Sequence, residues 1–298
     1  MSIVVPPIKC QGIKTKLVEW IKENIPDFSG KWYEPFMGSG VVGFNIRPKK
    51  AIFSDSNPHI IQFYNDIKNN VITPIKINQF LKNESEKLLV GSDSYYNEIR
   101  QRFNENPNSY DFLFLNRACF NGMMRFNSKG KFNVPFCKKP NRFAQAYITK
   151  ITNQILNVQS IIQNNDYEFI LNTFDNIISK AENCDFIYCD PPYIDRYSDY
   201  FNSWDTDDEK KLYLLLKNTK AKFILSTWSH NKYRENVYID KFWNDFNVEK
   251  KKHFYYLGAN EENRNEMYEA LVFNYPKSNI IKLVPKQQLI QLSLNFAN

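Results

Sequence analysis

The stretch DFIYCDPPY, residues 185–193, places an acid, two prolines and a tyrosine directly after a short apolar run. The run FIYC has the composition of a buried strand. Proline has no backbone N–H to give to a neighbouring strand, so Pro191 and Pro192 must end it. Asp190 and Tyr193 are therefore expected at the carboxyl end of a strand, where open α/β sheets bind their ligands.

These groups suit an exocyclic amine on a planar base. The Asp190 carboxylate and the Pro191 carbonyl can each accept one N–H of an –NH2 group, and Tyr193 offers a flat ring for stacking. The structural alternative is an ordinary Pro-Pro strand end beside a surface aspartate, but that alternative requires neither the acid nor the ring. We therefore predict Asp190, Pro191, Pro192 and Tyr193 as catalytic residues.

The glycine turn EPFMGSG, residues 34–40, is the second candidate site. Gly38 and Gly40 permit positive φ and a close approach of backbone to ligand. Asp55 ends the next predicted strand, where it could hold ribose hydroxyls. The turn is neither a Walker loop nor a full GxGxxG motif. Turn and acid in this order favour an adenosine-type cofactor, although a tight turn without a ligand has the same residues.

A basic segment follows from residue 112 to residue 150. It has no Asp or Glu, and it carries +8 in a chain whose net charge is +7, so the remainder is close to neutral. Eight aromatic residues are interleaved with the basic ones, a composition that suits a phosphate backbone and stackable bases. A solvated loop over a small core is the alternative. The basic residues are Arg117, Arg125, Lys129, Lys131, Lys138, Lys139, Arg142 and Lys150.

Composition narrows the class of protein further. The five cysteines are odd in number and lack a CxxC pair, which predicts a reduced, cytoplasmic protein without disulfides. The chain has only three histidines, which argues against His-based metal catalysis, and we predict no metal. We find neither a signal peptide nor an apolar run of membrane-spanning length.

Hydrophobic periodicity predicts an α/β sheet interrupted by an inserted module. Strands are expected at 31–36, 51–55, 167–172, 185–190, 222–228, 253–258 and 269–275. Helices are expected at 15–25, 57–69, 146–163, 174–182 and 207–219, with Asn57 as a cap. Residues 73–110 read as helical, and 126–134 as a hairpin around Lys129-Gly130.

The order EPFMGSG, basic insert, DPPY resembles the Dam-like, D12 class of DNA adenine-N6 methyltransferases. The insert sequence FLNRACFNGMMRFNSKGKFNVPF is similar to the target-recognition hairpin of that family. The resemblance implies a Rossmann-like S-adenosylmethionine-dependent methyltransferase sheet with an inserted, mostly helical recognition domain carrying a β-hairpin. The catalytic domain would comprise 1–71 and 146–298, and the recognition domain 72–145.

The resemblance also implies the residues that bind. KCQGIK resembles the family's KWAGGK, although Cys10 stands where that pattern has a tryptophan. Expected cofactor contacts are Cys10, Lys14, Glu34, Pro35, Phe36, Gly38, Gly40, Asp55 and Asp190. Expected DNA contacts are Arg117, Phe120, Asn121, Arg125, Asn127, Lys129, Lys138 and Lys139.

The insert is most similar to the EcoRV-type modification enzymes of this family. That likeness implies the palindrome GATATC, modified at its first adenine, whereas likeness to the wider Dam-like group implies GATC. The expected partner is double-stranded DNA, bound by a monomer, and a cognate restriction endonuclease would share the target site without direct contact.

Three other functions stay open at this point. A cytosine-N4 methyltransferase has the same site design but usually carries Ser before the two prolines. An RNA or protein amide methyltransferase typically has Asn there. A non-enzymatic DNA-binding protein would explain the insert and leave the glycine turn, Asp55 and DPPY without purpose.

Overall fold

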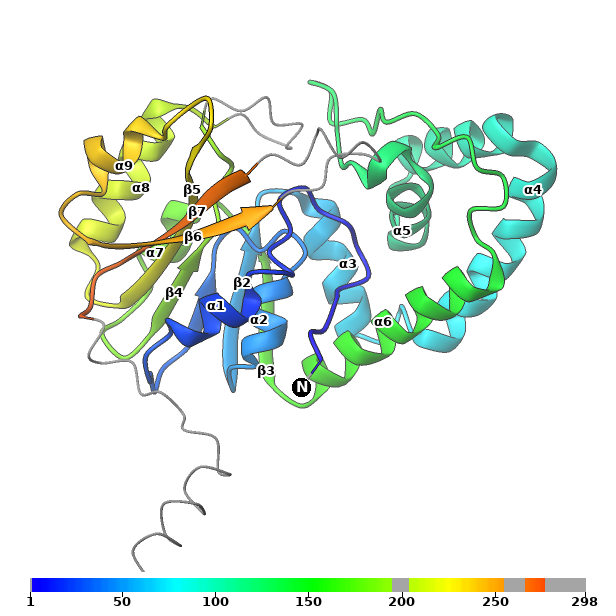
Figure 1. Ribbon diagram of the computed structural model, residues 1–298. Coiled ribbons are helices and arrows are strands. Elements are labelled where there is room, and N and C mark those ends of the chain that lie inside the picture. Colours follow the sequence, from blue (N-terminus) through cyan, green and yellow to red (C-terminus); the bar gives the residue numbers. More distant parts are fainter. Residues whose placement is uncertain (1, 195–203, 255–265, 277–298) are drawn as a thin grey trace, which may run out of the picture.

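A computed structural model describes residues 2–194, 204–254 and 266–276. In this part of the chain, seven strands form one sheet in the order β3-β2-β1-β4-β5-β7-β6 (Figure 1). Neighbours from β3 to β5 are parallel, and β7 runs antiparallel to both β5 and β6. The strands are β1 (Trp32–Glu34), β2 (Lys50–Asp55), β3 (Asp166–Leu171), β4 (Phe186–Cys189), β5 (Lys222–Asn231), β6 (Asn247–Phe254) and β7 (Glu266–Phe273).

Helices cover both faces of this sheet, which confirms the predicted α/β class (Figure 1). One face packs against the first group, α1 (Val18–Glu23), α2 (Val41–Ile46) and α3 (Pro58–Lys68). The other face packs against α7 (Phe174–Ile178), α8 (Thr206–Asn218) and α9 (Val237–Phe242). None of the described helices is both long enough and apolar enough to cross a membrane.

Alternation along the central strands produces the two faces. In β4, Phe186 and Tyr188 belong to the core on the α1–α3 side, while Ile187 and Cys189 belong to the core on the α7–α9 side. Successive side chains of a strand point to opposite faces, so a strand buried on both sides is apolar throughout. All four residues of β4 are buried, which agrees with this position in the middle of the sheet.

The insert is built on α4 (Pro74–Glu105) and α5 (Ser109–Ala118), and α6 (Gln145–Gln163) returns from it to the sheet (Figure 1). Helix α4 is interrupted at Ser92, where φ is 45°. The apolar core of the insert is continuous with the core on the α1–α3 face of the sheet. The insert therefore has no separate hydrophobic centre that would let it move as an independent body.

The predicted hairpin at 126–134 forms only in part. Phe126 and Phe132 make a single antiparallel bridge around the turn, within a segment that is otherwise loop. Asn127 N–H donates to the Lys131 carbonyl at 2.9 Å, and Asn133 N–H donates to the Arg125 carbonyl at 3.2 Å. Further from the turn, Pro135 has no N–H to donate, and the Met123 N–H donates to the Phe120 carbonyl at 3.2 Å. The hairpin around Lys129-Gly130 is thus confirmed, with a single bridge in place of a longer ladder.

The closing antiparallel pair is present, with one strand displaced. Strand β7 lies where 269–275 predicted it, but β6 is Asn247–Phe254 rather than 253–258. Residues 255–258 lie outside the described residues. The sequence of β6, NVEKKKHF, has four charged residues among its eight, and this hid the strand. An edge strand tolerates such charges because one of its sides faces solvent.

Candidate active site and nucleic-acid surface

The predicted site residues meet at the carboxyl ends of three adjacent strands. The glycine turn follows β1, Asp55 ends β2, and Asp190 follows β4, and the sheet order places β1 between the other two. A backbone hydrogen bond from Met37 N–H to the Ser54 carbonyl, at 2.9 Å, ties the turn to the end of β2. The sheet thus brings together residues that are up to 156 positions apart in sequence.

The two glycines of the turn are required for different reasons. Gly40 has φ 68°, and a Cβ there would lie 2.6 Å from the Phe44 ring, so internal packing demands glycine. Gly38 has φ 46°, and a Cβ would meet only Cys10, at an ordinary contact distance of 3.8 Å. Gly38 therefore leaves open space beside Cys10, where a ligand can approach the backbone.

Asp55 joins the turn to helix α3. Its Oδ2 accepts from Gly38 N–H and its Oδ1 from Asn57 N–H, both at 2.9 Å. Asn57 in turn caps α3, as predicted, by accepting from His59 N–H. A carboxylate has about four lone-pair sites, so Asp55 keeps acceptor capacity for a hydroxyl after these two bonds. Burial raises the pKa of Asp55, and the hydrogen bonds from the backbone oppose the shift.

A series of hydrogen-bonded side chains links Asp190, after β4, to β7, which lies two strands away in the sheet. Lys14 Nζ lies 2.9 Å from Asp190 Oδ1, and it donates to Tyr193 Oη at 2.9 Å and to the Gly12 carbonyl at 3.2 Å. Tyr193 donates to Glu269 Oε2 at 2.7 Å. The Lys14 ammonium also lies 4.9 Å from the centre of the Tyr193 ring. Glu269 is on β7, far from the motifs in sequence, and the sequence analysis did not single it out.

The acceptor groups at Asp190 are available to a substrate. In the described part of the chain, no hydrogen bond reaches Asp190 Oδ2 or the Pro191 carbonyl. Burial raises the pKa of Asp190, Lys14 opposes this shift, and Glu269 adds to it. Lys14 therefore favours the ionised form of Asp190 and occupies one of its oxygens, while the other oxygen is left to accept.

Cys10 lies beside the turn, next to Gly38. Burial raises the pKa of its thiol well above the ordinary value, and the negative charges of Asp55 and Asp190 act in the same direction. The thiol is therefore neutral at pH 7 and contributes an apolar wall next to Gly38.

Glu34 does not face the open side of the turn. Only 2% of its surface is exposed, and its Oε2 accepts from the Trp32 indole N–H at 2.8 Å and from Gly43 N–H at 3.1 Å. The carboxyl group thus supports β1 and the start of α2 from inside the protein, rather than contacting a ligand as predicted. Pro35 is buried next to it, and Phe36 stacks on Phe174.

The loop after α5 presents several predicted DNA contacts to solvent. Phe120 is 51% exposed, an unusual position for a large apolar ring. Asn121 is also exposed and has φ 54°. Lys129 lies at the exposed turn, and Lys138 and Lys139 are exposed further along the loop.

Two predicted DNA contacts form hydrogen bonds within the protein, but Arg117 is buried whereas Asn127 is exposed. Arg117 is only 3% exposed, because its guanidinium donates to the Pro7 carbonyl, the Tyr147 hydroxyl and the Gln154 side chain. Asn127 Oδ1 accepts from Lys129 N–H and Lys131 N–H and so holds the turn together. Sequence alone did not distinguish a basic side chain that joins three segments from one that faces solvent.

Arg125 is partly buried and has a defined orientation. Its Nε donates to Asn133 Oδ1 at 2.9 Å, and Nη2 donates to the Asn133 carbonyl at 3.4 Å. This side chain links the two sides of the loop that contains the Lys129-Gly130 turn.

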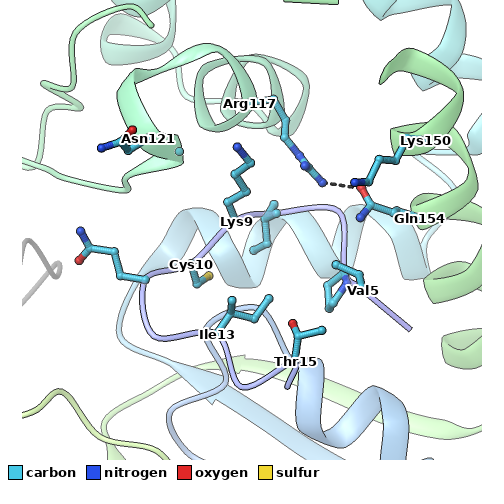
Figure 2. A pocket seen from close by; sticks show the side chains of 13 residues that line it. Val5, Lys9, Cys10, Ile13, Thr15, Arg117, Asn121, Lys150 and Gln154 are labelled. Atoms are coloured by element: carbon cyan, nitrogen blue, oxygen red, sulfur yellow. Dashed lines mark hydrogen bonds between the residues drawn. The ribbon is translucent and has the colours of Figure 1, made fainter. Parts of the chain in front are cut away.

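A pocket of about 400 Å³ lies between the N-terminal segment, α5 and α6. Figure 2 shows Lys9, Arg117 and Lys150 approaching it from these three segments, with Asn121 at its edge. None of its lining residues is Asp or Glu. Burial lowers the pKa of Lys9, and the positive charges of Arg142 and Arg117 add to this effect. The pocket extends the positive character of the exposed loop toward the strand-end site.

The comparisons with known proteins all point to the same family. Residues 11–257 match the family model described as D12 class N6 adenine-specific DNA methyltransferase. The chain is 30% identical to the type II methyltransferase M.MjaIII of Methanocaldococcus jannaschii, over 91% of this chain and 99% of that protein. It is 27% identical to the type II methyltransferase M1.LlaDCHI of Lactococcus lactis subsp. cremoris, over 91% of this chain and 95% of that protein. It is 31% identical to a DNA adenine methylase of Haemophilus influenzae, over 63% of each.

The buried carboxyl of Glu34 predicts a pH-dependent stability. Burial raises its pKa from 4.5 to about 8, so between these values the folded chain keeps a proton that the unfolded chain releases. The free energy of unfolding should therefore fall with rising pH, by at most about 1.4 kcal/mol per pH unit for this one group. Urea unfolding at pH 6 and pH 8 measures the fall.

Glu34→Gln should show a smaller fall over the same interval, because the amide does not titrate. Burial raises the pKa of Asp55 in both proteins, whereas the charge of Asp190 raises the pKa of Glu34, so the difference reports Glu34 together with its coupling to Asp190. Equal slopes for wild type and variant would contradict the assignment.

Proposed function

The chain belongs to the D12 class of N6 adenine-specific DNA methyltransferases, and from this membership we propose that it transfers a methyl group from S-adenosylmethionine to N6 of an adenine flipped out of duplex DNA. The observation that carries the proposal is the Asp190 carboxylate, with one oxygen held by Lys14 and the other open beside the Pro191 carbonyl. These two acceptors match the two N–H bonds of an exocyclic amine.

The residues around the glycine turn fit the cofactor. The open backbone at Gly38 would admit its methionine end, and the spare acceptor capacity of Asp55 suits ribose hydroxyls. Cys10 would form an apolar wall, and Lys14 would link the cofactor side of the site to Asp190. When bound, S-adenosylmethionine supplies a methyl group made electrophilic by its sulfonium.

Asp190 and the Pro191 carbonyl would activate the adenine amine. The N6 lone pair is delocalised into the ring, so the free amine is a poor nucleophile. Hydrogen bonds from both N6 protons to these acceptors favour tetrahedral geometry and localise the lone pair toward the methyl group. Asp190 would also stabilise the positive charge that develops on N6. The Tyr193 ring, whose hydroxyl is anchored to Glu269, would stack on the base.

The basic insert would bind and open the DNA. N6 faces a partner base in the duplex, so the nucleotide must leave the stack at a cost of about a few kcal/mol. The exposed Phe120 would fill the space that the base leaves. Lys129, Lys138 and Lys139 would contact phosphates. Residues 72–145 are thus the proposed recognition domain, in which the buried Arg117 supports the structure and the exposed Asn127 would contact DNA from the turn.

The proposed target is GATATC, in the setting of restriction and modification. Two relatives are named type II methyltransferases, which supports that setting, and a cognate endonuclease would then recognise the same site without touching this chain. We propose that the enzyme acts as a monomer on DNA in the cytoplasm.

Arg125 is the proposed guanine reader, because guanidinium can donate two parallel bonds to guanine O6 and N7. Asn133 would hold it in that orientation.

Replacement of Asp190 tests the catalytic role. Asp190→Ala should reduce single-turnover methyl transfer by at least about 10²-fold, because a stabiliser of developing charge is lost. DNA affinity should stay within about twofold of wild type, because Asp190 is proposed to contact the base and not the phosphates. Asp207→Ala, at an exposed carboxylate on α8, should leave both quantities unchanged. Near-normal turnover in Asp190→Ala would refute the role.

Salt dependence tests the path of the DNA. Each phosphate contact contributes about −0.9 to the slope of log affinity against log salt concentration. Lys138→Ala with Lys139→Ala should flatten the slope by up to twice that amount without altering the preferred sequence. Lys180→Ala with Lys220→Ala is the matched control. Both lysines are exposed and precede strands β4 and β5, so they lie toward the amino ends of the strands, away from the carboxyl ends that carry the site. If only the control pair changes the slope, the DNA lies elsewhere.

Methylation mapping tests the target. DNA from cells expressing the protein should carry N6-methyladenine at GATATC, while GATC sites outside that palindrome should be unmodified. Arg125→Ala should reduce discrimination at a guanine by about 1–3 kcal/mol. Lys129→Ala should weaken binding to all sequences equally. Methylated GATC in other contexts would refute the proposed site, and an unchanged preference in Arg125→Ala would refute its reader.

A further inference from the structure

Glu269 has a place in the site that no motif indicates. We infer that it is a positioning residue for methyl transfer, which acts on Lys14 and Asp190 through the hydroxyl of Tyr193. The inference rests on the proposed function and adds a residue to it. Three segments that are distant in sequence would then share one hydrogen-bonded chain, namely the N-terminal segment, the end of β4, and β7.

The burial of Glu269 is the first observation. It lies in the interior of β7, opposite Trp228 of β5 and Lys251 of β6, and its side chain is 0% exposed. Its neighbours Ala270 and Leu271 are also fully buried. A charge in such a place costs solvation free energy unless partners satisfy it, so a packing role alone would be better filled by an apolar residue.

The direction of the hydrogen bonds is the second observation. A carboxylate only accepts, and a tyrosine hydroxyl has one proton to donate. Because Tyr193 donates to Glu269 at 2.7 Å, its oxygen lone pairs are left to accept from Lys14 at 2.9 Å. Without Glu269 the hydroxyl proton can rotate toward Lys14, and this would turn an attractive contact into a repulsive one.

The third observation is that this series of hydrogen bonds leads from Glu269 to Asp190. Lys14 is 3% exposed, and its ammonium lies within hydrogen-bonding distance of Tyr193, Gly12 and Asp190 Oδ1. An ammonium held by several acceptors has little freedom to move, so the Asp190 oxygen that it binds is held too. The other Asp190 oxygen then keeps a fixed direction. Glu269 thus acts on the reacting amine only through Tyr193 and Lys14.

A double-mutant cycle tests this relay. The variants are Glu269→Met, which has similar bulk and no acceptor oxygen, Tyr193→Phe, which keeps the ring and removes the hydroxyl, and the two combined. The readouts are the single-turnover methylation rate at saturating DNA and cofactor, and the affinity for S-adenosylmethionine by calorimetry. Glu269→Met should lower the rate at least about tenfold. In the Tyr193→Phe background the same change should cost less than about twofold.

Two further variants separate a relay from a loss of folding. Glu269→Gln keeps an acceptor oxygen and should recover part of the rate lost in Glu269→Met. Leu271→Val, at a fully buried position on the same strand, should lower the melting temperature but have the same effect on rate in both backgrounds. Cofactor affinity should show the same dependence on the Tyr193 hydroxyl, because Lys14 belongs to both parts of the site.

The outcomes distinguish this inference from the proposed function. If wild type methylates adenine and the losses from Glu269→Met and Tyr193→Phe multiply, Glu269 acts independently of Tyr193 and the inference is wrong. The same holds if Glu269→Met retains the wild-type rate. If wild type neither binds S-adenosylmethionine nor forms N6-methyladenine, the proposed function fails, and the inference fails with it.

Discussion

The ion pair between Lys14 and Asp190 is the contact on which the site depends. Asp190 follows a fully buried strand, where a carboxyl group tends to take up a proton and lose its value as an acceptor. Lys14 opposes that tendency from 2.9 Å and is itself almost completely buried. A pair of this kind is stable only when further hydrogen bonds satisfy both partners. Tyr193 and the Gly12 carbonyl supply those bonds to Lys14, and Glu269 in turn accepts from Tyr193, so the N-terminal segment is held against the strand ends. The second oxygen of Asp190 receives no such bond from the described residues.

The sheet provides the rigid frame for this pair. Parallel strands end at one edge, and adjacency of β2, β1 and β4 puts Asp55, the glycine turn and Asp190 side by side. Glu34 supports the turn from beneath through the indole of Trp32 and the backbone of α2. Carboxyl groups thus occupy two different settings around the turn. The carboxyl group of Glu34 is buried and supports the fold, whereas one oxygen of Asp190 is held by Lys14 and the other can accept a further bond.

Charge separates the two working surfaces of the molecule. Carboxyl groups surround the strand-end site, while the insert and the pocket beside it are basic. A basic surface attracts nucleic acid over a distance, and acidic groups at the reaction centre favour developing positive charge. The continuous apolar core between insert and sheet keeps these surfaces in a fixed relation. Arg117 reinforces the junction by joining α5 to the N-terminal segment and α6.

The sequence by itself determined the α/β class, most helices and strands, the glycine turn, Asp55 and DPPY. These features depend on local signals, such as apolar periodicity, a proline that ends a strand, or a glycine that adopts positive φ. Only the tertiary structure decided that Glu34 and Arg117 serve internal roles, and that Glu269 joins the site through Tyr193. It also showed that a single bridge, between Phe126 and Phe132, joins the two sides of the predicted hairpin. The physical reason is that a polar side chain's role depends on its partners, and the Tyr193–Glu269 bond spans 76 residues. No local pattern specifies a contact across that separation.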